Sequence, residues 1–217
     1  MLQETIFSDG EGDAWFKRNP EPYEPEIDPV LSCLRAHSIR PVNILEIGAG
    51  RGDRLAELNK RYAANVTGVD PSTAALEHCR TEFPVVQFVS GTARALPLMA
   101  DAYDLVIATF VFHWIDRKSL LASAAEVDRV LKAEGYLIIG DFAPFTPKKV
   151  RYHHRPDVEV YTYKQDYAAL FLATAGYVTV AEQILDHQTL KPDPNVSEHE
   201  RFSLTLLKKL REGIYST

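Results

Sequence analysis

Three closely spaced glycines and two acidic residues carry the chemistry that this sequence suggests first. Residues 43–52 read Asn-Ile-Leu-Glu-Ile-Gly-Ala-Gly-Arg-Gly, and residues 66–70 read Val-Thr-Gly-Val-Asp. Glycine lets the backbone turn sharply and lets a ligand approach the main chain closely. A lone acid at the end of the next apolar run, Asp70, can accept two hydrogen bonds from a ribose diol. Together, the two segments predict a site for a nucleoside-containing cofactor.

Glu46 lies two residues before the first glycine, Gly48, and narrows the choice of cofactor. In the dinucleotide fingerprint Gly-x-Gly-x-x-Gly, the glycine turn faces a pyrophosphate, which a neighbouring carboxylate would repel. The turn here is Gly-x-Gly-x-Gly, and Glu46 would attract the ammonium group of an amino acid, directly or through water. Because Glu46 lies within a strand that should be buried, we also expect it to have a polar partner. The pattern therefore favours S-adenosylmethionine over a nicotinamide dinucleotide.

Strands and helices alternate around these residues, which is the pattern of a parallel sheet covered on both faces. Apolar runs predict strands over residues 43–47, 65–69, 85–89, 103–109 and 136–140, and helical periodicity predicts helices over 53–62, 72–83 and 118–131. Gly135 is expected to end the last of these helices. An earlier helix should begin at Asp28-Pro29 and extend to about residue 37, because Asp suits the N-cap and Pro the first helical position.

After Asp141 this alternation stops. Residues 142–162 are rich in proline, aromatic and basic residues, and we expect them to form a long loop or lid. Residues 163–174 are predicted to be helical. Two further strands are expected over 177–185 and 202–207, joined by a polar connection, and they should form an antiparallel pair at the end of the sheet.

The composition argues against several classes of partner. The net charge is −6 and no basic face stands out, so nucleic acid is not expected as a partner. The two cysteines form no Cys-x-x-Cys pair, which argues against zinc-thiolate and disulfide chemistry. Residues 152–155 read Tyr-His-His-Arg, but adjacent histidines point in different directions, and no metal is expected. No apolar signal segment or membrane-spanning run is present, so we expect a soluble cytoplasmic protein that binds no membrane; the sequence leaves its oligomeric state open.

Several motifs, in the right order, resemble those of class I S-adenosylmethionine-dependent methyltransferases, of the small, type 11-like kind that acts on diverse metabolites. The similarity covers roughly residues 44–140. It includes the glycine turn, the ribose-binding acid, the adenine-side loop, the fourth strand and the approach to the fifth, at residues 44–52, 66–72, 90–98, 103–114 and 131–140.

The resemblance implies a Rossmann-like α/β fold with a mostly parallel seven-stranded sheet, an antiparallel last strand and helices on both faces. The 217 residues suit one such domain. We divide it into an N-terminal cap segment, a cofactor-binding core, a lid or substrate loop, and a C-terminal helix with strands, at residues 1–40, 41–141, 142–165 and 166–217.

The resemblance also implies which residues bind the cofactor: Glu46, Gly48, Ala49, Gly50, Gly52, Asp70, Pro71, Thr92, Ala93, Thr109 and Phe110. The family often has an acid where this chain has Thr92, and that acid accepts a hydrogen bond from the adenine amino group. The Thr92 hydroxyl can accept it less strongly, or the backbone near Ala93 can suffice.

Other residues are candidates for the rest of the site. Trp15, Phe16 and Arg18 either pack on the surface or cover the cofactor, with Arg18 meeting the methionyl carboxylate. The segment with Phe110, Phe112 and Trp114 supplies core packing and walls of the site. Four residues could act as a general base for a hydroxyl acceptor, namely His113, Asp141, His153 and His154.

The expected reaction is methyl transfer to a small molecule. Residues 10–19 and 141–167 loosely resemble methylases of bacterial surface-sugar biosynthesis, including those near pseudaminic acid pathways, which implies a sugar or nucleotide-sugar acceptor. Another small metabolite, such as a carboxylate, a natural product or a quinone-like molecule, is the alternative. A non-catalytic protein with the same fold that acts through partners also fits, and an NAD-dependent oxidoreductase fits less well because of Glu46.

Overall fold

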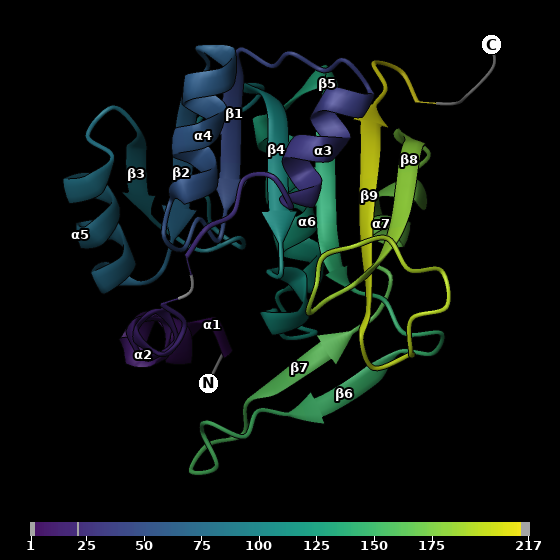
Figure 1. Cartoon of the computed structure of the whole chain (residues 1–217). Helices are drawn as coiled ribbons and strands as arrows, with labels where there is room; N and C mark the ends of the chain where they lie inside the picture. Colours follow the sequence, from purple (N-terminus) through teal and green to yellow (C-terminus); the bar gives the residue numbers. More distant parts are fainter. Residues whose placement is uncertain (1–2, 21, 214–217) are drawn as a thin grey trace.

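A seven-stranded sheet forms the centre of the structure, a computed structural model in which residues 3–20 and 22–213 are described. The strand order is β3-β2-β1-β4-β5-β9-β8 (Figure 1). The strands are β1 (Asn43–Ile47), β2 (Asn65–Asp70), β3 (Gln87–Ser90), β4 (Tyr103–Thr109), β5 (Leu131–Phe142), β8 (Tyr177–Asp186) and β9 (Arg201–Lys209). Neighbours among β1 to β5 are parallel, whereas β9 is antiparallel to both β5 and β8. The predicted fold class and the predicted antiparallel pair at the end of the sheet are confirmed.

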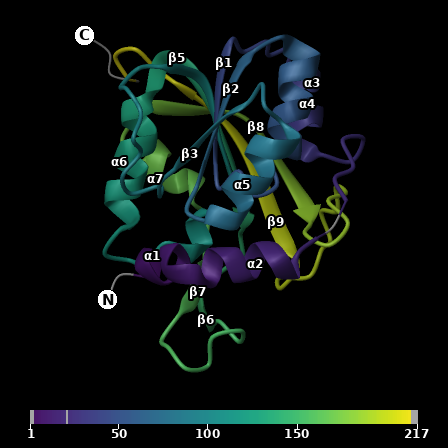
Figure 2. The same ribbon diagram turned by 90° about the vertical axis from the view of Figure 1, so that its left-hand side faces the viewer.

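Helices cover both faces of this sheet (Figure 2). They are α3 (Pro29–Ala36), α4 (Asp53–Tyr62), α5 (Thr73–Glu82), α6 (Leu120–Val130) and α7 (Ala168–Leu172). Apolar side chains of α3, α4 and α5 pack with Ile44, while those of α6 and α7 pack with Leu45 and Ile47. Successive residues of β1 thus enter opposite cores, which explains its near-continuous apolar sequence.

The start of α3 agrees with the sequence prediction. The Asp28 carboxylate accepts hydrogen bonds from the backbone nitrogens of Val30 and Leu31 at 2.8 and 3.1 Å, and Pro29 occupies the first helical position. Both features satisfy or remove backbone donors that have no partner at a helix start.

Gly135 does not end a helix, contrary to the sequence prediction. Helix α6 ends at Val130, and Leu131 already belongs to β5, where it pairs with Tyr103 and is fully buried. The strand register then shifts, and Gly135 lies within this irregular part of β5. A Cβ atom there would lie 2.9 Å from the carbonyl oxygen of Lys132, so close backbone packing accounts for the glycine.

The expected loop after β5 contains a two-stranded antiparallel hairpin, β6 (Lys148–Arg151) and β7 (Tyr161–Lys164), which projects from the body (Figure 1). The helix predicted over residues 163–174 is therefore shorter: its first residues lie in β7, and α7 begins only at Ala168. Aromatic and β-branched residues at 161–163 favour a strand, and Thr162 is buried by the pairing.

An N-terminal helical segment crosses the carboxyl ends of the parallel strands (Figures 1 and 2). It consists of α1 (Gln3–Ile6), a π-helical turn η1 (Phe7–Glu11) and α2 (Gly12–Arg18). Asp13 attaches α2 to the start of α5, because its carboxylate accepts hydrogen bonds from Ser72 Oγ at 2.7 Å and from the Ala74 nitrogen at 3.0 Å.

Candidate functional site

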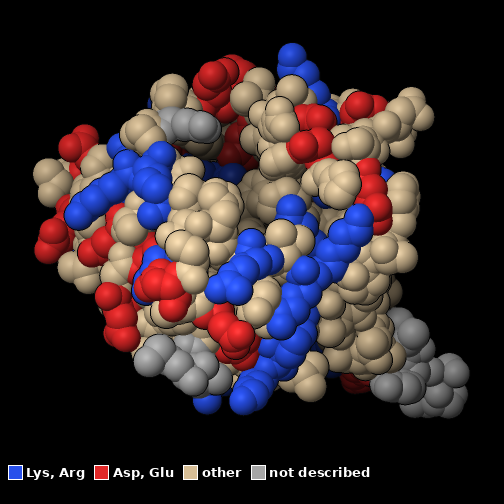
Figure 3. All heavy atoms as spheres, turned by 90° about the horizontal axis from the view of Figure 1, so that it is seen from below, with Lys and Arg blue, Asp and Glu red and all other residues tan. Residues whose placement is uncertain are grey.

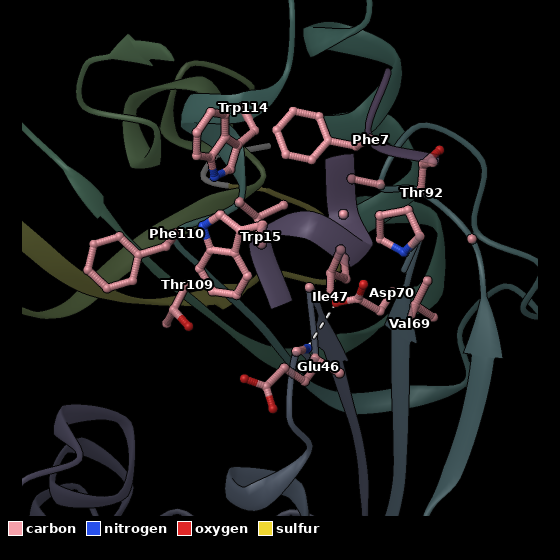
Figure 4. A pocket seen from close by; sticks show the side chains of 18 of the residues that line it. Phe7, Trp15, Glu46, Ile47, Val69, Asp70, Thr92, Thr109, Phe110 and Trp114 are labelled. Carbon is pink, nitrogen blue, oxygen red and sulfur yellow. Dashed lines mark hydrogen bonds between the residues drawn. The ribbon is translucent and has the colours of Figure 1, made fainter. Parts of the chain in front are cut away.

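A cavity of about 490 Å³ lies between the carboxyl ends of the central strands and the N-terminal segment. Its volume is that of a small-molecule site. All residues predicted to bind the cofactor except Arg18 line it: Glu46, Gly48, Ala49, Gly50, Gly52, Asp70, Pro71, Thr92, Ala93, Thr109 and Phe110. The structure therefore gathers them from the ends of β1, β2, β3 and β4 around one space (Figure 4).

The glycine turn forms the floor of this cavity. Gly48 and Gly50 have φ of +71° and +52°, a region that glycine adopts at little cost. A Cβ atom at Gly48 would lie 2.6 Å from Val111 Cγ2, while one at Gly50 would meet no atom within 4 Å. The nitrogen of Gly48 donates to the Val69 carbonyl at 2.8 Å, which fixes the turn to β2. The backbone at Gly50 is thus open to a ligand.

Asp70 lies at the end of β2 and faces the same cavity. One carboxylate oxygen accepts a hydrogen bond from the Gly50 nitrogen at 2.9 Å (dashed in Figure 4), and the other accepts one from the Ser72 nitrogen at 2.8 Å. Burial raises the pKa of Asp70, although these two hydrogen bonds oppose the rise. Each oxygen retains a second lone pair, which suits it to a pair of ribose hydroxyls.

A buried ionic cluster borders the cavity on the other side of the turn. Arg54 lies between two acids: its Nε donates to Asp28 at 2.7 Å, and its Nη1 donates to Glu46 and to Thr109 Oγ1, the latter at 2.9 Å. Glu46 thus has the polar partner that we expected. Two carboxyl groups face one guanidinium, so one negative charge would be uncompensated within the cluster when both acids are ionised. Glu46 Oε2 is buried without a hydrogen-bond partner in the described part of the chain.

The surroundings of Glu46 weaken its acidity. Burial is the largest cause and raises the pKa of Glu46 to about 7, with Asp28 and Asp70 adding to the rise and Arg54 opposing it. A cation placed beside Glu46 Oε2 would favour the ionised carboxylate. We did not predict Arg54 from the sequence. The only indication was that a buried Glu46 needs a polar partner. Arg54 supplies that partner from the first turn of α4.

Aromatic side chains gather around one end of the cavity, away from Asp70 (Figure 4). Phe7, Trp15, Phe110 and Trp114 line it, with the ring centroids of Phe7 and Trp114 4.9 Å apart. Phe7 was not predicted from the sequence. Phe112, by contrast, is fully buried in the core.

Arg18 does not line the cavity. Its guanidinium donates to Glu11 and, at 2.6 Å, to the Tyr152 hydroxyl. It therefore joins α2 to the connection between β6 and β7.

The three histidines predicted as bases do not line the cavity either. His113 is buried, and its Nδ1 lies 2.8 Å from a carboxylate oxygen of Asp141. His153 and His154 are exposed between β6 and β7, with their ring centroids 3.9 Å apart. Within residues 3–20 and 22–213, no three His, Cys, Asp or Glu side chains are arranged to hold a metal ion.

The basic residues of the hairpin also lie outside the cavity lining. Lys and Arg side chains form a band across this end of the molecule (Figure 3). Lys149 Nζ lies 3.7 Å from the ring centroid of Tyr161, and the Arg117 guanidinium lies 4.4 Å from that of Tyr163. Both cations are exposed, and their role towards a substrate stays a prediction.

Comparisons with known proteins show similarity to methyltransferases. Residues 44–135 match the family model described as a methyltransferase domain. A malonyl-[acyl-carrier protein] O-methyltransferase of Geobacter sulfurreducens is 28% identical over 77% of this chain and 66% of its own length. A demethylmenaquinone methyltransferase of Thermotoga maritima is 32% identical over 51% of this chain and 48% of its own. The chain thus spans about half to two thirds of these relatives.

A solved structure agrees in fold. The 1,6-didemethyltoxoflavin-N1-methyltransferase of Burkholderia thailandensis, determined with 1,6-didemethyltoxoflavin and S-adenosylhomocysteine bound, aligns with a TM-score of 0.69 at 19% identity, over 95% of this chain and 87% of that one. The predicted fold and the predicted cofactor, S-adenosylmethionine, agree with these findings. No helix in the described ranges is long and apolar enough to cross a membrane.

Proposed function

We propose that this chain, whose residues 44–135 match the family model of a methyltransferase domain, is a class I S-adenosylmethionine-dependent enzyme that transfers a methyl group from that cofactor to a small molecule. The observation that carries the proposal is the buried Glu46 Oε2, which has no hydrogen-bond partner among the described residues, beside a glycine turn and a ribose-type acid in one cavity. An ammonium group would donate to this oxygen and favour the ionised carboxylate, whereas the pyrophosphate of a dinucleotide would be repelled by it.

The residues around the cavity suit the parts of that cofactor. Asp70 would hold the ribose, and Glu46 Oε2 would accept a hydrogen bond from the methionyl ammonium. Arg54 lines the cavity, and the structure records no hydrogen bond from its Nη2 to the described residues. We assign it the methionyl carboxylate, the role we had expected for Arg18, since a guanidinium binds carboxylates well.

The aromatic end of the cavity favours a planar acceptor. Phe7, Trp15, Phe110 and Trp114 offer ring faces, which suit both a flat apolar ring and a sulfonium cation. A sugar, our expectation from the outer segments, would need several free hydroxyl partners, whereas the Asp116 carboxylate and the Ser123 hydroxyl in the cavity lining already form hydrogen bonds within the chain. Two of the similar proteins are named for ring compounds, demethylmenaquinone and 1,6-didemethyltoxoflavin. We therefore propose a quinone-like or heteroaromatic acceptor in place of a sugar.

The chemistry needs little from a protein base. The cofactor supplies a methyl group that is already activated on sulfur, so the chain's contribution is to bind, orient and exclude water. None of His113, His153 and His154 lines the cavity. An acceptor whose own ring stabilises the nucleophilic atom, such as a ring nitrogen or a hydroquinone carbon, fits a site of this kind.

Ligand titration tests the proposal. S-adenosylhomocysteine is expected to raise the melting temperature of the chain and to give a calorimetric binding isotherm, and NAD is expected to do neither. Stabilisation by NAD alone would contradict the cofactor assignment, and no response to either would favour a non-catalytic interaction protein. Product mass analysis with quinones, heteroaromatic rings and nucleotide sugars then tests the acceptor class.

Cofactor binding should depend on pH through Glu46. Because the pKa of this carboxyl is about 7, S-adenosylhomocysteine is expected to bind more weakly as the pH falls from 8 to 6, by up to about tenfold per pH unit below the pKa. Glu46→Gln should bind weakly at pH 8 and show a flat profile. Calorimetry at several pH values measures both, with the exposed Glu77→Gln as the matched control.

The same group should affect stability in the opposite sense. A raised pKa means that the folded chain binds the proton more tightly than the unfolded chain. The contribution of Glu46 to the free energy of unfolding of the cofactor-free chain therefore increases as the pH falls from about 7 towards about 4.3, the ordinary pKa of a glutamate. If the Glu46→Gln variant binds S-adenosylhomocysteine with the same pH dependence as the wild-type chain, Glu46 is excluded as the titrating group.

A further inference from the structure

The N-terminal segment is held at both ends over the cavity. At one end, Gln3 is buried, and its Nε2 donates to the carbonyl oxygens of Trp114 and Tyr161, both at 2.6 Å. At the other, Asp13 binds the start of α5. The residues between these anchors therefore have a defined position above the carboxyl edge of the sheet.

Glu4, next to the first anchor, reaches the loop that follows β3. Its Oε1 lies 2.7 Å from Arg94 Nη1, and its Oε2 accepts a hydrogen bond from Thr92 Oγ1 at 3.3 Å. All three residues line the cavity, and the Glu4 side chain is 23% exposed. A carboxylate from the start of the chain thus forms part of this wall of the cavity.

The order of the strands indicates which part of a bound cofactor would lie next to the part of the cavity formed by Glu4, Thr92 and Arg94. Glu46 and Arg54 lie on the β1 side of Asp70, where the charged amino-acid end belongs. The loop with Thr92 follows β3, on the opposite side of β2. It begins close to the ribose acid, because the Gly91 nitrogen donates to the Asp70 carbonyl at 3.3 Å. A nucleoside whose ribose is on Asp70 therefore directs its base towards Thr92 and Glu4.

We propose that Glu4 accepts a hydrogen bond from the exocyclic amino group of adenine, an inference that rests on the proposed cofactor. Thr92 is a short side chain whose hydroxyl already donates to Glu4, and Arg94 holds the same carboxylate in place. Base recognition then comes from a separate segment of the chain and not from the loop itself. Adenine is bound fully only when α1 is seated, so the segment that covers the site also selects the cofactor.

A ligand that lacks the amino group tests this role. S-inosylhomocysteine carries a carbonyl where S-adenosylhomocysteine carries the amino group, and a carboxylate would repel it. The wild-type chain is expected to prefer the adenosyl ligand by about tenfold or more. Glu4→Ala should reduce this preference to about threefold or less, and Glu4→Ala combined with Thr92→Asp should restore it. Calorimetric titration of both ligands gives the ratio.

The ratio separates recognition from packing. If Glu4 only fixed the N-terminal segment in place, Glu4→Ala would reduce the affinity for both ligands by the same factor. The ratio of the two affinities would then equal that of the wild-type chain, which would overturn the proposal. Glu77→Ala, at an exposed position on α5, should leave both affinities unchanged. Failure of the wild-type chain to bind S-adenosylhomocysteine at all would instead refute the proposed function, and the role of Glu4 with it.

Discussion

Asp70→Ala is expected to bind S-adenosylhomocysteine about 100-fold more weakly than the wild-type chain. A ribose diol on this carboxylate would make two hydrogen bonds to a charged acceptor, each of which contributes about 1.5 kcal/mol or more. The variant also loses the hydrogen bond from the Gly50 nitrogen that fixes the open part of the glycine turn. Isothermal titration calorimetry at pH 8, where Glu46 is ionised, measures the change.

Two controls show whether the loss comes from the ribose. The 2′,3′-dideoxy analogue of S-adenosylhomocysteine should bind the wild-type chain weakly. The Asp70→Ala variant should bind this analogue no more weakly than it binds S-adenosylhomocysteine itself. Asp157→Ala, at an exposed position between β6 and β7, should leave both affinities unchanged. An Asp70→Ala variant with wild-type affinity and a wild-type circular dichroism spectrum would refute the ribose role.

Arg54→Met is expected to destabilise the cofactor-free chain by about 3–5 kcal/mol, because it leaves two buried carboxylates without their cation. Asp28 and Glu46 are each 3% exposed, so water cannot replace the guanidinium well. Asp28 also caps α3, so the loss should extend to that helix. Urea denaturation at pH 8, followed by circular dichroism, gives the free energy of unfolding.

A second substitution distinguishes charge from packing. Adding Glu46→Gln to Arg54→Met removes one of the unpaired charges and should recover part of the stability. Arg61→Met, on the same helix but in a surface ion pair with Glu57, should cost about 1 kcal/mol or less. If Arg54→Met and Arg61→Met lower the free energy of unfolding by equal amounts, the buried cluster contributes no more to stability than a surface ion pair.

The sheet and its ligand-facing edge could be predicted because their signals are local. Apolar runs such as 103–109 are long enough to identify a buried strand, and Asp28-Pro29 marks a helix start by the chemistry of two adjacent residues. The glycines and Asp70 follow directly after such strands. Parallel strands present their carboxyl ends at one edge, so these residues had to meet.

Side chains that reach the cavity from distant segments could not be predicted in the same way. Glu4 contacts a residue 88 positions away, and no spacing in the sequence indicates that pair. Arg18 and His113 have suitable chemistry, but their nearest acids, Glu11 and Asp141, hold them away from the cavity lining. Residue type identifies candidates, whereas tertiary contacts decide which of them meet the ligand.

The hairpin was missed for a related reason. Lys148–Arg151 is a short, mostly exposed strand without an apolar run, and it is stable only because it pairs with Tyr161–Lys164. Short strands that depend on a partner across a long connection carry a weak periodic signal.

The anchoring of Gln3 has a consequence for the synthesis of the chain. Its partner Tyr161 is 158 residues further along, so the first helices leave the ribosome long before this anchor can form. The glycine turn, Asp70 and the Asp13 anchor can assemble while the nascent chain is still incomplete, but the Gln3 anchor of the segment above them cannot be completed until β7 has been made. The part of the site that is translated first is therefore the part that is completed last.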